Sequence, residues 1–314
     1  MINIKNFSEV NPCDVAYLWN EEVGFIYPLT EQLFDQNVTG CEYFCRDASF
    51  VATQDDKVVG FIISKIWNND PAIESYKTIG WISLFYVARK HRMQGIGSTL
   101  LAKAEMKLRE KGITTIHLGR DVNNFFPGIP CDFDNLTAAF MEKRGYVCGR
   151  RTYDLIRYDL SGVSEYMPKN IIRFAEKEDL PEIISFFDKN FPGRWQYDAK
   201  RNFIEGLYRQ YLLALDGKKV IGFMRMSLPN DEMRPYSLTW YARFKNLGGI
   251  GPLGVDKDYR KKGVFNDLIN YGLYHFKNIG IKEVIIDWTG LISLYQKYGF
   301  EIWKVYQYAS KELV

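Results

Sequence analysis

The same succession of short segments occurs twice along the 314 residues of this chain. In each half, two apolar runs flank a polar turn (residues 49–61 and 211–223), and another apolar run then leads through a basic, glycine-containing loop into an amphipathic segment. The turn at Asp216 and Gly217 is a strong signal for a β-hairpin. The repeated order predicts two domains of one fold rather than one large core.

The segments after the hairpins predict one strand–loop–helix unit in each half. Apolar strands are expected at residues 82–87 and 250–255, and a basic loop follows each of them. The helices after the loops extend to about residues 111 and 278, and their apolar positions recur with the spacing of a helix that buries one face. These positions are Leu100, Leu101, Ala104 and Leu108 in the first helix, and Phe265, Leu268, Ile269, Gly272 and Phe276 in the second.

Each half continues with an apolar strand, a short helix that ends at a glycine, and a last strand. We expect these strands at residues 114–118, 151–158, 283–287 and 302–308. A polar connection at residues 161–165 precedes a new strand at 171–173 and separates the halves. The pattern therefore predicts domains at residues 1–160 and 161–314.

The charge balance and the few metal-binding side chains argue against several classes of function. Lys and Arg total 41 against 38 Asp and Glu, a formal net charge of +3, which is too small to indicate a nucleic-acid partner. Five irregularly spaced cysteines and three histidines predict no metal site, and reduced thiols are typical of a cytoplasmic protein. The first residues do not resemble a signal peptide and no apolar run has membrane-spanning length, so we expect a cytoplasmic protein without a membrane partner.

The loop after the strand at 82–87 carries the clearest sign of chemistry. Glycines let a backbone turn tightly and approach a ligand, and the amides at a helix N-terminus attract an anion. The arrangement suits a pyrophosphate, although a glycine-containing helix start without a ligand has the same pattern, and the third glycine of the dinucleotide fingerprint is missing. The loop residues are Arg92, Met93, Gln94, Gly95, Ile96, Gly97 and Ser98.

This Arg-x-x-Gly-x-Gly run resembles the acyl-CoA loop of the GNAT acetyltransferase superfamily. Residues 140–146 resemble the superfamily's Phe-Tyr-x-Lys-x-Gly-Phe, and the second half matches again at 255–265 and 294–300. The resemblance implies an α/β (α+β) fold of two tandem GNAT domains, each with a mixed, mostly antiparallel central sheet, a splayed parallel strand pair and flanking helices. It also implies an N-acetyltransferase that uses acetyl-CoA as donor and acts on a small-molecule amine.

The resemblance further implies that backbone amides at the end of the splayed strand contact the thioester and the pantetheine arm. These lie near Phe85 and Val87, or near Leu253 and Val255. The first half has Met141 where the superfamily usually carries tyrosine, and the second phosphate loop ends in a phenylalanine instead of Gly or Ala. We expect both halves to hold CoA, the second through Arg260, Lys261, Lys262, Gly263, Val264 and Phe265.

Two residues of the second half are candidates for proton transfer. Tyr295 matches the superfamily's tyrosine and would protonate the leaving thiolate, unless it is only a packed core residue. Asp287 ends an apolar strand beside Trp288, where desolvation would raise its pKa as a general base requires; the alternative is an Asp that caps the following turn. The first half contains no comparable pair, so we expect catalysis in the second domain and a degenerate copy in the first.

The acceptor pocket is expected around two similar segments, residues 125–130 and 191–195. Their aromatic and polar side chains suit a sugar, although Pro-Gly turns with packed aromatic residues have the same pattern. The tandem halves and the Asp-Trp-Thr-Gly run at 287–290 resemble the bacterial glucosamine/glucosaminide N-acetyltransferases, which implies an amino-sugar acceptor. The substrate-binding candidates are Phe126, Arg194, Trp195 and Trp288, with Asp132, Asp134 and Asp198 nearby.

Other functions remain open at the level of sequence. The acceptor could instead be a mycothiol-type precursor, an aminoglycoside, a polyamine or a peptide N-terminus. A non-catalytic acyl-CoA sensor or interaction protein is the alternative from another class, because each half departs from the superfamily pattern at one position. The sequence does not distinguish a monomer from a homodimer.

Overall fold

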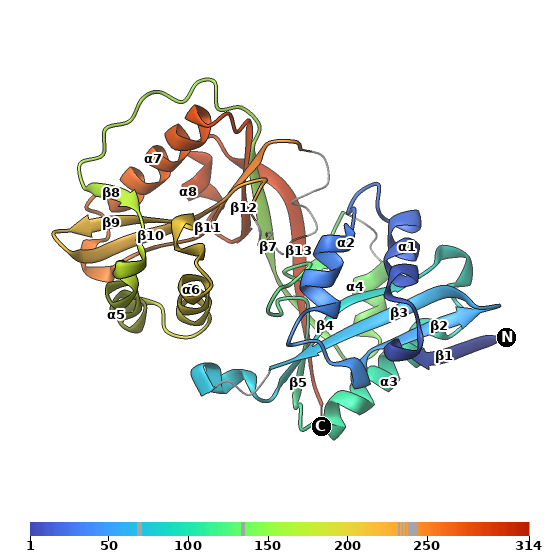
Figure 1. Ribbon diagram of the computed structural model, residues 1–314. Helices are drawn as coiled ribbons and strands as arrows, with labels where there is room; N and C mark the ends of the chain where they lie inside the picture. The colour runs from blue at the N-terminus through green and yellow to red at the C-terminus, as the bar shows by residue number, and fades with distance from the viewer. Residues whose placement is uncertain are drawn as a thin grey trace. The chain divides into compact units, whose positions relative to one another are not determined.

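The computed structural model describes residues 1–67, 71–132, 136–231, 233, 235, 237 and 244–313, and it forms two compact units (Figure 1). Unit 1 consists of Met1–Thr152, Pro235–Arg243 and Lys304–Val314. Unit 2 consists of Tyr153–Arg234 and Phe244–Trp303. Each unit therefore contains chain from more than one stretch of the sequence.

The sheet of unit 1 is mixed, and among the strand pairs recorded for its described residues β4 with β5 is the parallel one. The pairs β1–β2, β2–β3, β3–β4 and β13–β5 are antiparallel, and the short β6 (Ile129–Pro130) also pairs with β13. In spatial order the strands are β1 (Ile2–Asn6), β2 (Phe50–Gln54), β3 (Lys57–Ile66), β4 (Ile79–Val87), β5 (Thr115–Leu118), β13 (Glu301–Glu312) and β7 (Val147–Arg157).

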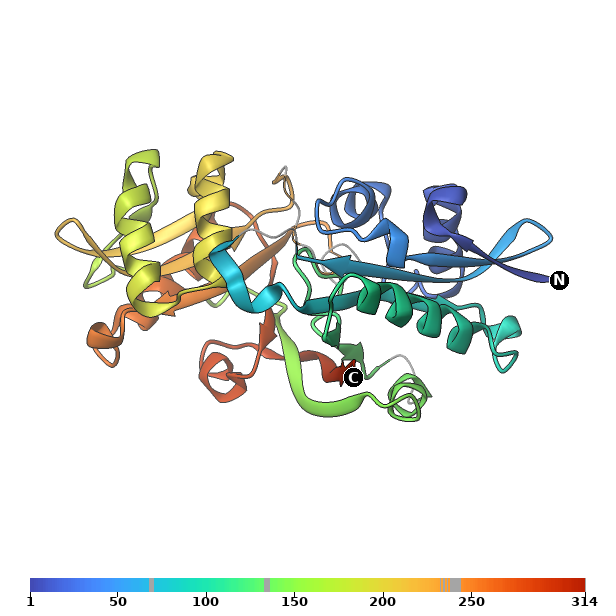
Figure 2. The ribbon, with the colours of Figure 1, turned by 90° about the horizontal axis from the view of Figure 1, so that it is seen from below.

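Helices cover both faces of this sheet (Figure 2). On one face lie α1 (Pro12–Glu22) and α2 (Glu31–Phe34), and on the other lie α3 (Ile96–Glu110) and α4 (Leu136–Glu142). The strands alternate accordingly: Val51 and Phe61 pack with α1, whereas Ala52 and Ile62 pack with α3. The apolar face predicted for α3 is confirmed, because Leu100, Leu101, Ala104 and Leu108 are buried.

Unit 2 repeats this plan. Its sheet has the order β8 (Ile171–Phe174), β9 (Tyr211–Asp216), β10 (Lys219–Ser227), β11 (Leu247–Val255), β12 (Glu283–Thr289) and the end of β7, and only β11–β12 is parallel among the pairs in the described residues. One face packs on α5 (Leu180–Asn190) and α6 (Arg194–Ile204), and the other on α7 (Val264–Asn278) and α8 (Ile292–Gln296). The predicted α+β fold with splayed parallel pairs is confirmed.

The two last strands cross between the units. The strand β13 follows α8 of unit 2, but its residues from Lys304 onward pair with β5 and β6 in unit 1. The strand β7 begins in unit 1, and its residues from Tyr153 onward pair with β12 in unit 2. The sequence pattern predicted both strands but not the strands that they pair with, because the residue pattern of one strand does not identify its neighbours in the sheet.

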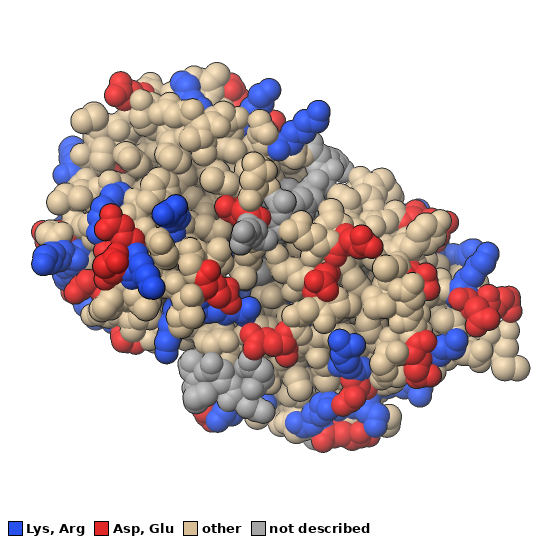
Figure 3. Space-filling view, in the orientation of Figure 1, with Lys and Arg blue, Asp and Glu red and all other residues tan. Residues whose placement is uncertain are grey.

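Charges of both signs lie interspersed on the face shown in Figure 3, as the near-balanced composition leads one to expect. No helix in the described part of the chain is both long enough and apolar enough to cross a membrane. Nor do His, Cys, Asp and Glu side chains of the described residues gather in groups of three or more that could hold a metal ion.

Candidate functional site

Two loops with the same backbone shape precede α3 and α7. In the first, Met93 and Gly95 have φ values of 61° and 80°; in the second, Lys261 and Gly263 have φ values of 62° and 88°. Each glycine is the N-cap of its helix. A glycine has no side chain that could accept a hydrogen bond from the backbone amides of the first helical turn, so the N-cap residue leaves these amides uncapped. This is the geometry in which a helix N-terminus binds an anion.

An arginine fixes the start of each loop. The Nε of Arg92 donates to the carbonyl oxygen of Val87 at 3.0 Å, and the Nε of Arg260 donates to that of Val255 at 3.4 Å. The two arginines therefore tie the loop back to the strand that precedes it. Both sets of predicted phosphate-binding residues are thus placed at equivalent strand–loop–helix junctions.

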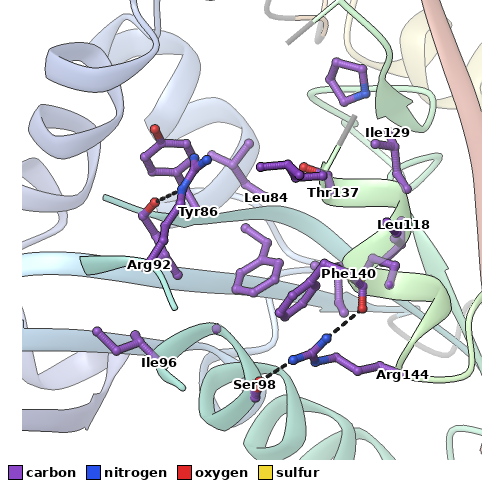
Figure 4. A pocket seen from close by; sticks show the side chains of 18 of the residues that line it. Leu84, Tyr86, Arg92, Ile96, Ser98, Leu118, Ile129, Thr137, Phe140 and Arg144 are labelled. Carbon is purple, nitrogen blue, oxygen red and sulfur yellow. Dashed lines mark hydrogen bonds between the residues drawn. The ribbon is translucent and has the colours of Figure 1, made fainter. Parts of the chain in front are cut away.

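The first loop borders a cavity of about 670 Å³ in unit 1 (Figure 4). The side of the cavity at the loop is formed by Arg92, Met93, Gly95, Ile96, Gly97 and Ser98, with Phe85 and Val87 from β4. Gly97 lies against the rings of Phe140 and Phe85, where a Cβ would come within 3.3 Å of Phe140. Arg144 of the segment after α4 donates to Ser98 and so joins the loop to the opposite wall. Gln94 is exposed and turned back on the loop, its Nε2 donating to Lys90 at 3.3 Å.

The second loop is shaped differently at its helix end. Val264 is buried in the core below α7, and Phe265 packs its ring against Tyr295 and Tyr298, with ring centroids 5.8 Å apart in both cases. The Nζ of Lys262 lies 5.0 Å from the centre of the Tyr259 ring. The side chain of Phe265 thus lies against α8 and leaves the amides at the start of α7 uncovered by its ring, while the Lys262 amide donates to the carbonyl oxygen of Tyr259 at 3.4 Å.

The strands before the loops separate from their parallel partners at the same place. The pairing of β4 with β5 extends to Ile82 and Leu118, and that of β11 with β12 to Ile250 and Ile286. Immediately beyond, β4 carries an irregularity at residue 83, and β11 one at residues 251–252. Bulges of this kind bend a strand and recur next to active sites. The amides of Phe85, Val87, Leu253 and Val255 follow these bends, on the stretches that have left the parallel partner.

Asp287 is the first residue of β12 beyond the parallel pairing. Its Oδ1 lies so near Gly251 that a Cβ there would approach it to 2.9 Å, which places the carboxylate in the opening between the strands. Solvent reaches this side chain, yet the protein atoms around the carboxyl raise its pKa through desolvation. The guanidinium groups of Arg225 and Arg194 act in the opposite direction.

Tyr295 of α8 lies near this carboxylate. Its side chain is 5% exposed, and burial together with the negative charge of Asp287 raises its pKa to about 12. Its ring packs against Phe265, at the start of α7, and against Phe300. The second unit therefore brings Asp287, Tyr295 and the loop before α7 to one opening of the sheet.

The structure adds supporting residues that the sequence did not reveal. Trp288 has a φ of 48° within an irregular stretch of β12, and its backbone amide donates to Oδ1 of the buried Asp154 at 3.0 Å. Arg225 donates from Nε to Gln210 at 2.9 Å. The sequence signal for Asp154 is a charged residue next to the apolar Leu155 and Ile156 of β7, and no sequence pattern pairs Arg225 with Asp287.

The predicted acceptor residues are divided between the units. In unit 2, Arg194 forms an ion pair with Asp198 at 3.3 Å and lies 5.9 Å from the Trp288 ring, while Trp195 packs on Phe191 and is 38% exposed. In unit 1, Phe126 is buried against Trp19 and Tyr27 and lines the cavity. Asp132 is bound by Lys304 and Tyr27, and Asp134 is outside the described residues.

Unit 1 has neither a carboxylate nor a tyrosine at the positions that match Asp287 and Tyr295. The two parallel pairs correspond residue by residue, Ile82 with Ile250 and Leu118 with Ile286, so that Gly119 stands where Asp287 stands. Met141 of α4, in the run that matches α8, replaces Tyr295 and is buried. The cavity thus belongs to unit 1, whereas Asp287 and Tyr295 belong to unit 2.

Comparison with solved structures shows that the whole fold is shared with known tandem proteins. A GCN5-related glucosamine N-acetyltransferase region of a fungal multi-domain GH3 beta-N-acetylglucosaminidase has a TM-score of 0.87 and 21% identity, covering 99% of this chain and 38% of that one. A tandem GNAT protein from the clavulanic acid biosynthesis pathway has a TM-score of 0.65 and 16% identity, covering 99% of this chain and 98% of that one.

Sequence relatives are similar over shorter stretches. The mycothiol acetyltransferase of Geodermatophilus obscurus is 27% identical over 96 residues, which cover 29% of this chain and 28% of that protein. The match therefore spans less than a third of that relative's length, and the fungal enzyme is likewise much longer than this chain. The sequence profile of the acetyltransferase (GNAT) family, in contrast, matches residues 16–126 and again residues 180–300, more than half of the chain. This chain therefore belongs to the acetyltransferase (GNAT) family and carries two GNAT segments in tandem.

Proposed function

We propose that unit 2 transfers the acetyl group of acetyl-CoA to the amine of an amino sugar, with Asp287 as general base and Tyr295 as general acid. Membership of the family implies acetyl-CoA as donor and an amine as acceptor. The observation that carries the assignment to unit 2 is the joint position of Asp287 and Tyr295 at the opening of β11 and β12. No such pair occupies the matching positions Gly119 and Met141 in unit 1.

The proposed reaction is a direct attack of the amine on the thioester. Asp287 takes one proton from the substrate ammonium, and the free amine nitrogen then forms a bond to the carbonyl carbon. The carbon–sulfur bond breaks, and the second proton that the nitrogen loses passes to solvent. Amides near Leu253 and Val255 stabilise the negative charge that develops on the carbonyl oxygen. Tyr295 then donates its proton to the departing thiolate sulfur and is reprotonated from solvent. Its pKa of about 12 keeps it protonated at neutral pH, as an acid must be.

The donor is held by groups that are already in place. Backbone amides of residues 261–265 surround the positive-φ Gly263 at the start of α7, and the side chains of Arg260, Lys261 and Lys262 add positive charge. We propose the same role for residues 92–98 in unit 1, with Arg92 as the charged side chain. Two CoA sites per chain follow from this.

The acceptor is proposed from the side chains around Asp287. Trp288 and Trp195 offer flat apolar faces, while Arg194 and Asp198 offer hydrogen-bonding groups for hydroxyls. An amino sugar has both kinds of surface. The fungal region that shares the fold is described as a glucosamine N-acetyltransferase, and the proposal extends that acceptor class to this chain.

The proposal is tested by the release of free CoA from acetyl-CoA in the presence of different amines. We expect turnover with glucosamine or a glucosaminide to exceed turnover with an aminoglycoside, a polyamine, a mycothiol precursor or a peptide N-terminus. A preference for one of these would replace the acceptor and keep the reaction. Tight CoA binding without turnover on any amine would favour a sensor and overturn the proposal.

The site assignment is tested by two isosteric variants. Asp287→Asn and Tyr295→Phe should each lower kcat by about a hundredfold or more, the usual contribution of general acid–base catalysis, with little change in the affinity for acetyl-CoA. Asp159→Asn and Tyr17→Phe are matched controls, because both residues are exposed and neither is on β11, β12 or α8. Normal rates in Asp287→Asn and Tyr295→Phe would exclude these residues as the catalytic pair.

A further inference from the structure

The cavity of unit 1 extends well beyond a phosphate site. From the first loop it continues along β4, past Ser83 and Leu84, to an inner wall formed by α1 and the segment after it. In Figure 4, Leu84 and Thr137 approach each other across the cavity, with Phe140 nearer the loop. Its volume of about 670 Å³ is within the range of pockets that enclose a whole small ligand.

The inner wall is apolar because the polar atoms of its side chains are hydrogen-bonded within the protein and do not face the cavity unpaired. The indole nitrogen of Trp19 donates to the carbonyl oxygen of Tyr27 at 2.7 Å, and the hydroxyl of Tyr27 bonds to Asp132. The hydroxyl of Ser83 donates to Asp121 at 2.7 Å. These side chains therefore expose mainly ring and methylene surface to the cavity. Val23, Leu84 and Phe126 add further apolar surface to the same wall. Such a wall suits a hydrocarbon chain better than a charged amine.

The same region excludes a catalytic base. Gly119 has a φ of 64°, and a Cβ at this position would lie 2.3 Å from the carbonyl oxygen of Phe126. The backbone of residues 126–128 therefore occupies the space that the Asp287 side chain fills in unit 2. The Arg120 amide donates to the carbonyl oxygen of Phe126 at 3.0 Å, and the buried Lys65 fixes the residues just before the segment, because its Nζ donates to Asp121, Val122 and Asn123. Unit 1 cannot acquire a carboxylate at this place without rebuilding the segment.

We propose that unit 1 binds the CoA thioester of a linear acyl chain longer than acetyl, as a retained ligand that is not transferred. The first loop holds the pyrophosphate and the acyl chain lies along Leu84 toward Trp19 and Val23. The inference rests on the proposed CoA-binding role of this loop. It adds the chemical class of the ligand and separates it from the acetyl donor of unit 2.

Burial of each added methylene should strengthen binding by about fourfold until the chain reaches the inner wall. Calorimetry on the full-length chain with acetyl-, butyryl-, hexanoyl- and octanoyl-CoA measures this dependence without any acceptor amine. We expect one binding site whose affinity rises along the series and a second site that favours acetyl-CoA. Equal affinity for all four thioesters, or a single site for acetyl-CoA only, would overturn the inference.

Two substitutions from different elements locate the chain-length-dependent site. Leu84→Phe and Val23→Phe narrow the inner cavity and should weaken octanoyl-CoA binding by about tenfold or more, since at least two methylenes lose their place, while acetyl-CoA binding changes little. Val147→Phe is the matched control, because Val147 is 71% exposed on β7 and outside the cavity. If octanoyl-CoA binds equally well to both folded variants, the chain does not lie in this cavity. If neither variant folds, the series on the unmodified chain still decides.

The outcome is separable from that of the proposed function. Acetyl transfer to an amine is measured on the same preparation, and it depends on Asp287 and Tyr295 in unit 2. Turnover without any chain-length dependence of binding would contradict only the long-chain ligand of unit 1. A chain-length-dependent site without turnover would contradict only the proposed acetyl transfer.

Discussion

The pKa of Asp287 is lowered by side chains from two different elements and raised by burial. Desolvation raises the pKa of its carboxyl, whereas Arg225 from β10 and Arg194 from α6 lower it. Tyr295 from α8 has its own pKa raised in part by the same carboxylate. A base that works near neutrality needs a pKa above that of an ordinary aspartate but not so high that it stays protonated. The two arginines therefore limit the rise that burial causes.

Arg225→Gln should shift the acid limb of the pH–rate profile to higher pH. Arg225 favours the charged carboxylate, so its removal raises the pKa of Asp287, and a higher pH is then needed to deprotonate the base. The measurement is kcat/KM from acid to alkaline pH. Arg201→Gln is the control, because Arg201 pairs with Glu205 on α6 at 2.8 Å. An unchanged or lowered midpoint would mean that Asp287 is not the titrating base.

Asp154→Ala should lower kcat about ten- to a hundredfold, because a hydrogen bond to a carboxylate is worth about 1.5–3 kcal/mol. Asp154 accepts the Trp288 amide and so holds the irregular end of β12 on which Asp287 is carried. The KM for acetyl-CoA should stay close to its original value. Asp154→Asn keeps an acceptor oxygen and should recover most of the rate. Equal losses in both variants would point to general destabilisation instead of positioning.

Single residues could be predicted from sequence where a motif or a hydrophobic strand isolates them. Asp287 stands out at the end of an apolar run, and Tyr295 matches a family position. Asp154, Arg225 and Gln210 could not be found in this way, because their roles depend on strands that meet only in the folded chain. The roles proposed for Asp287 and Tyr295 are predictions that the experiments above address.

The two strand–loop–helix elements have the same backbone and different surroundings. Both glycine N-caps have positive φ and open space around the missing Cβ, so a substitution has the same conformational cost in each loop. Beyond them, the first loop borders the large cavity and the second borders Tyr295. The elements can therefore be compared directly by one matched pair of substitutions.

Gly263→Ala and Gly95→Ala provide that comparison. An alanine with left-handed φ costs about 1–2 kcal/mol, which corresponds to a roughly 5- to 30-fold weaker hold on the pyrophosphate. In acetyl transfer, kcat/KM for acetyl-CoA should fall more in Gly263→Ala than in Gly95→Ala. In calorimetry, the affinity for octanoyl-CoA should fall more in Gly95→Ala than in Gly263→Ala. A larger loss of turnover in Gly95→Ala would assign catalysis to unit 1.

Elements with a local signal were predicted well. The helix α3 was expected to extend to about residue 111 and spans Ile96–Glu110, and the helix α7 ends at Asn278 as expected. The bulges at residues 83 and 251–252 were not predicted, because they arise from the parting of two parallel strands that are distant in sequence. The cavity was missed for a similar reason, since its walls come from α1, β4, β5 and α4 together.

At the scale of the whole molecule, the repeat in the sequence and the compact units differ in their boundaries. The division into residues 1–160 and 161–314 follows the duplicated pattern, whereas unit 1 also includes Lys304–Val314 and unit 2 begins at Tyr153. The C-terminal strand contributes Tyr306 and Ala309 to the cores of unit 1, where both are buried. Tyr306 packs against Phe126 of the cavity wall, with centroids 6.1 Å apart.

Removal of residues 304–314 should therefore unfold unit 1, although these residues follow the sequence of unit 2. The deletion takes Tyr306, Ala309 and Leu313 out of the core and removes Lys304 from Asp132. A large buried side chain alone is worth about 2–5 kcal/mol, so the combined loss approaches the whole stability of a domain. Hydrogen exchange should show lost protection in β4, β5 and α3, while α7 and β12 exchange more slowly.

A peptide of residues 304–314 added in trans should restore protection, because it supplies the strand that pairs with β5. If β4, β5 and α3 stayed protected in the truncated chain, the strand would be an accessory to unit 1 rather than part of its core, and the first half of the sequence would fold without it.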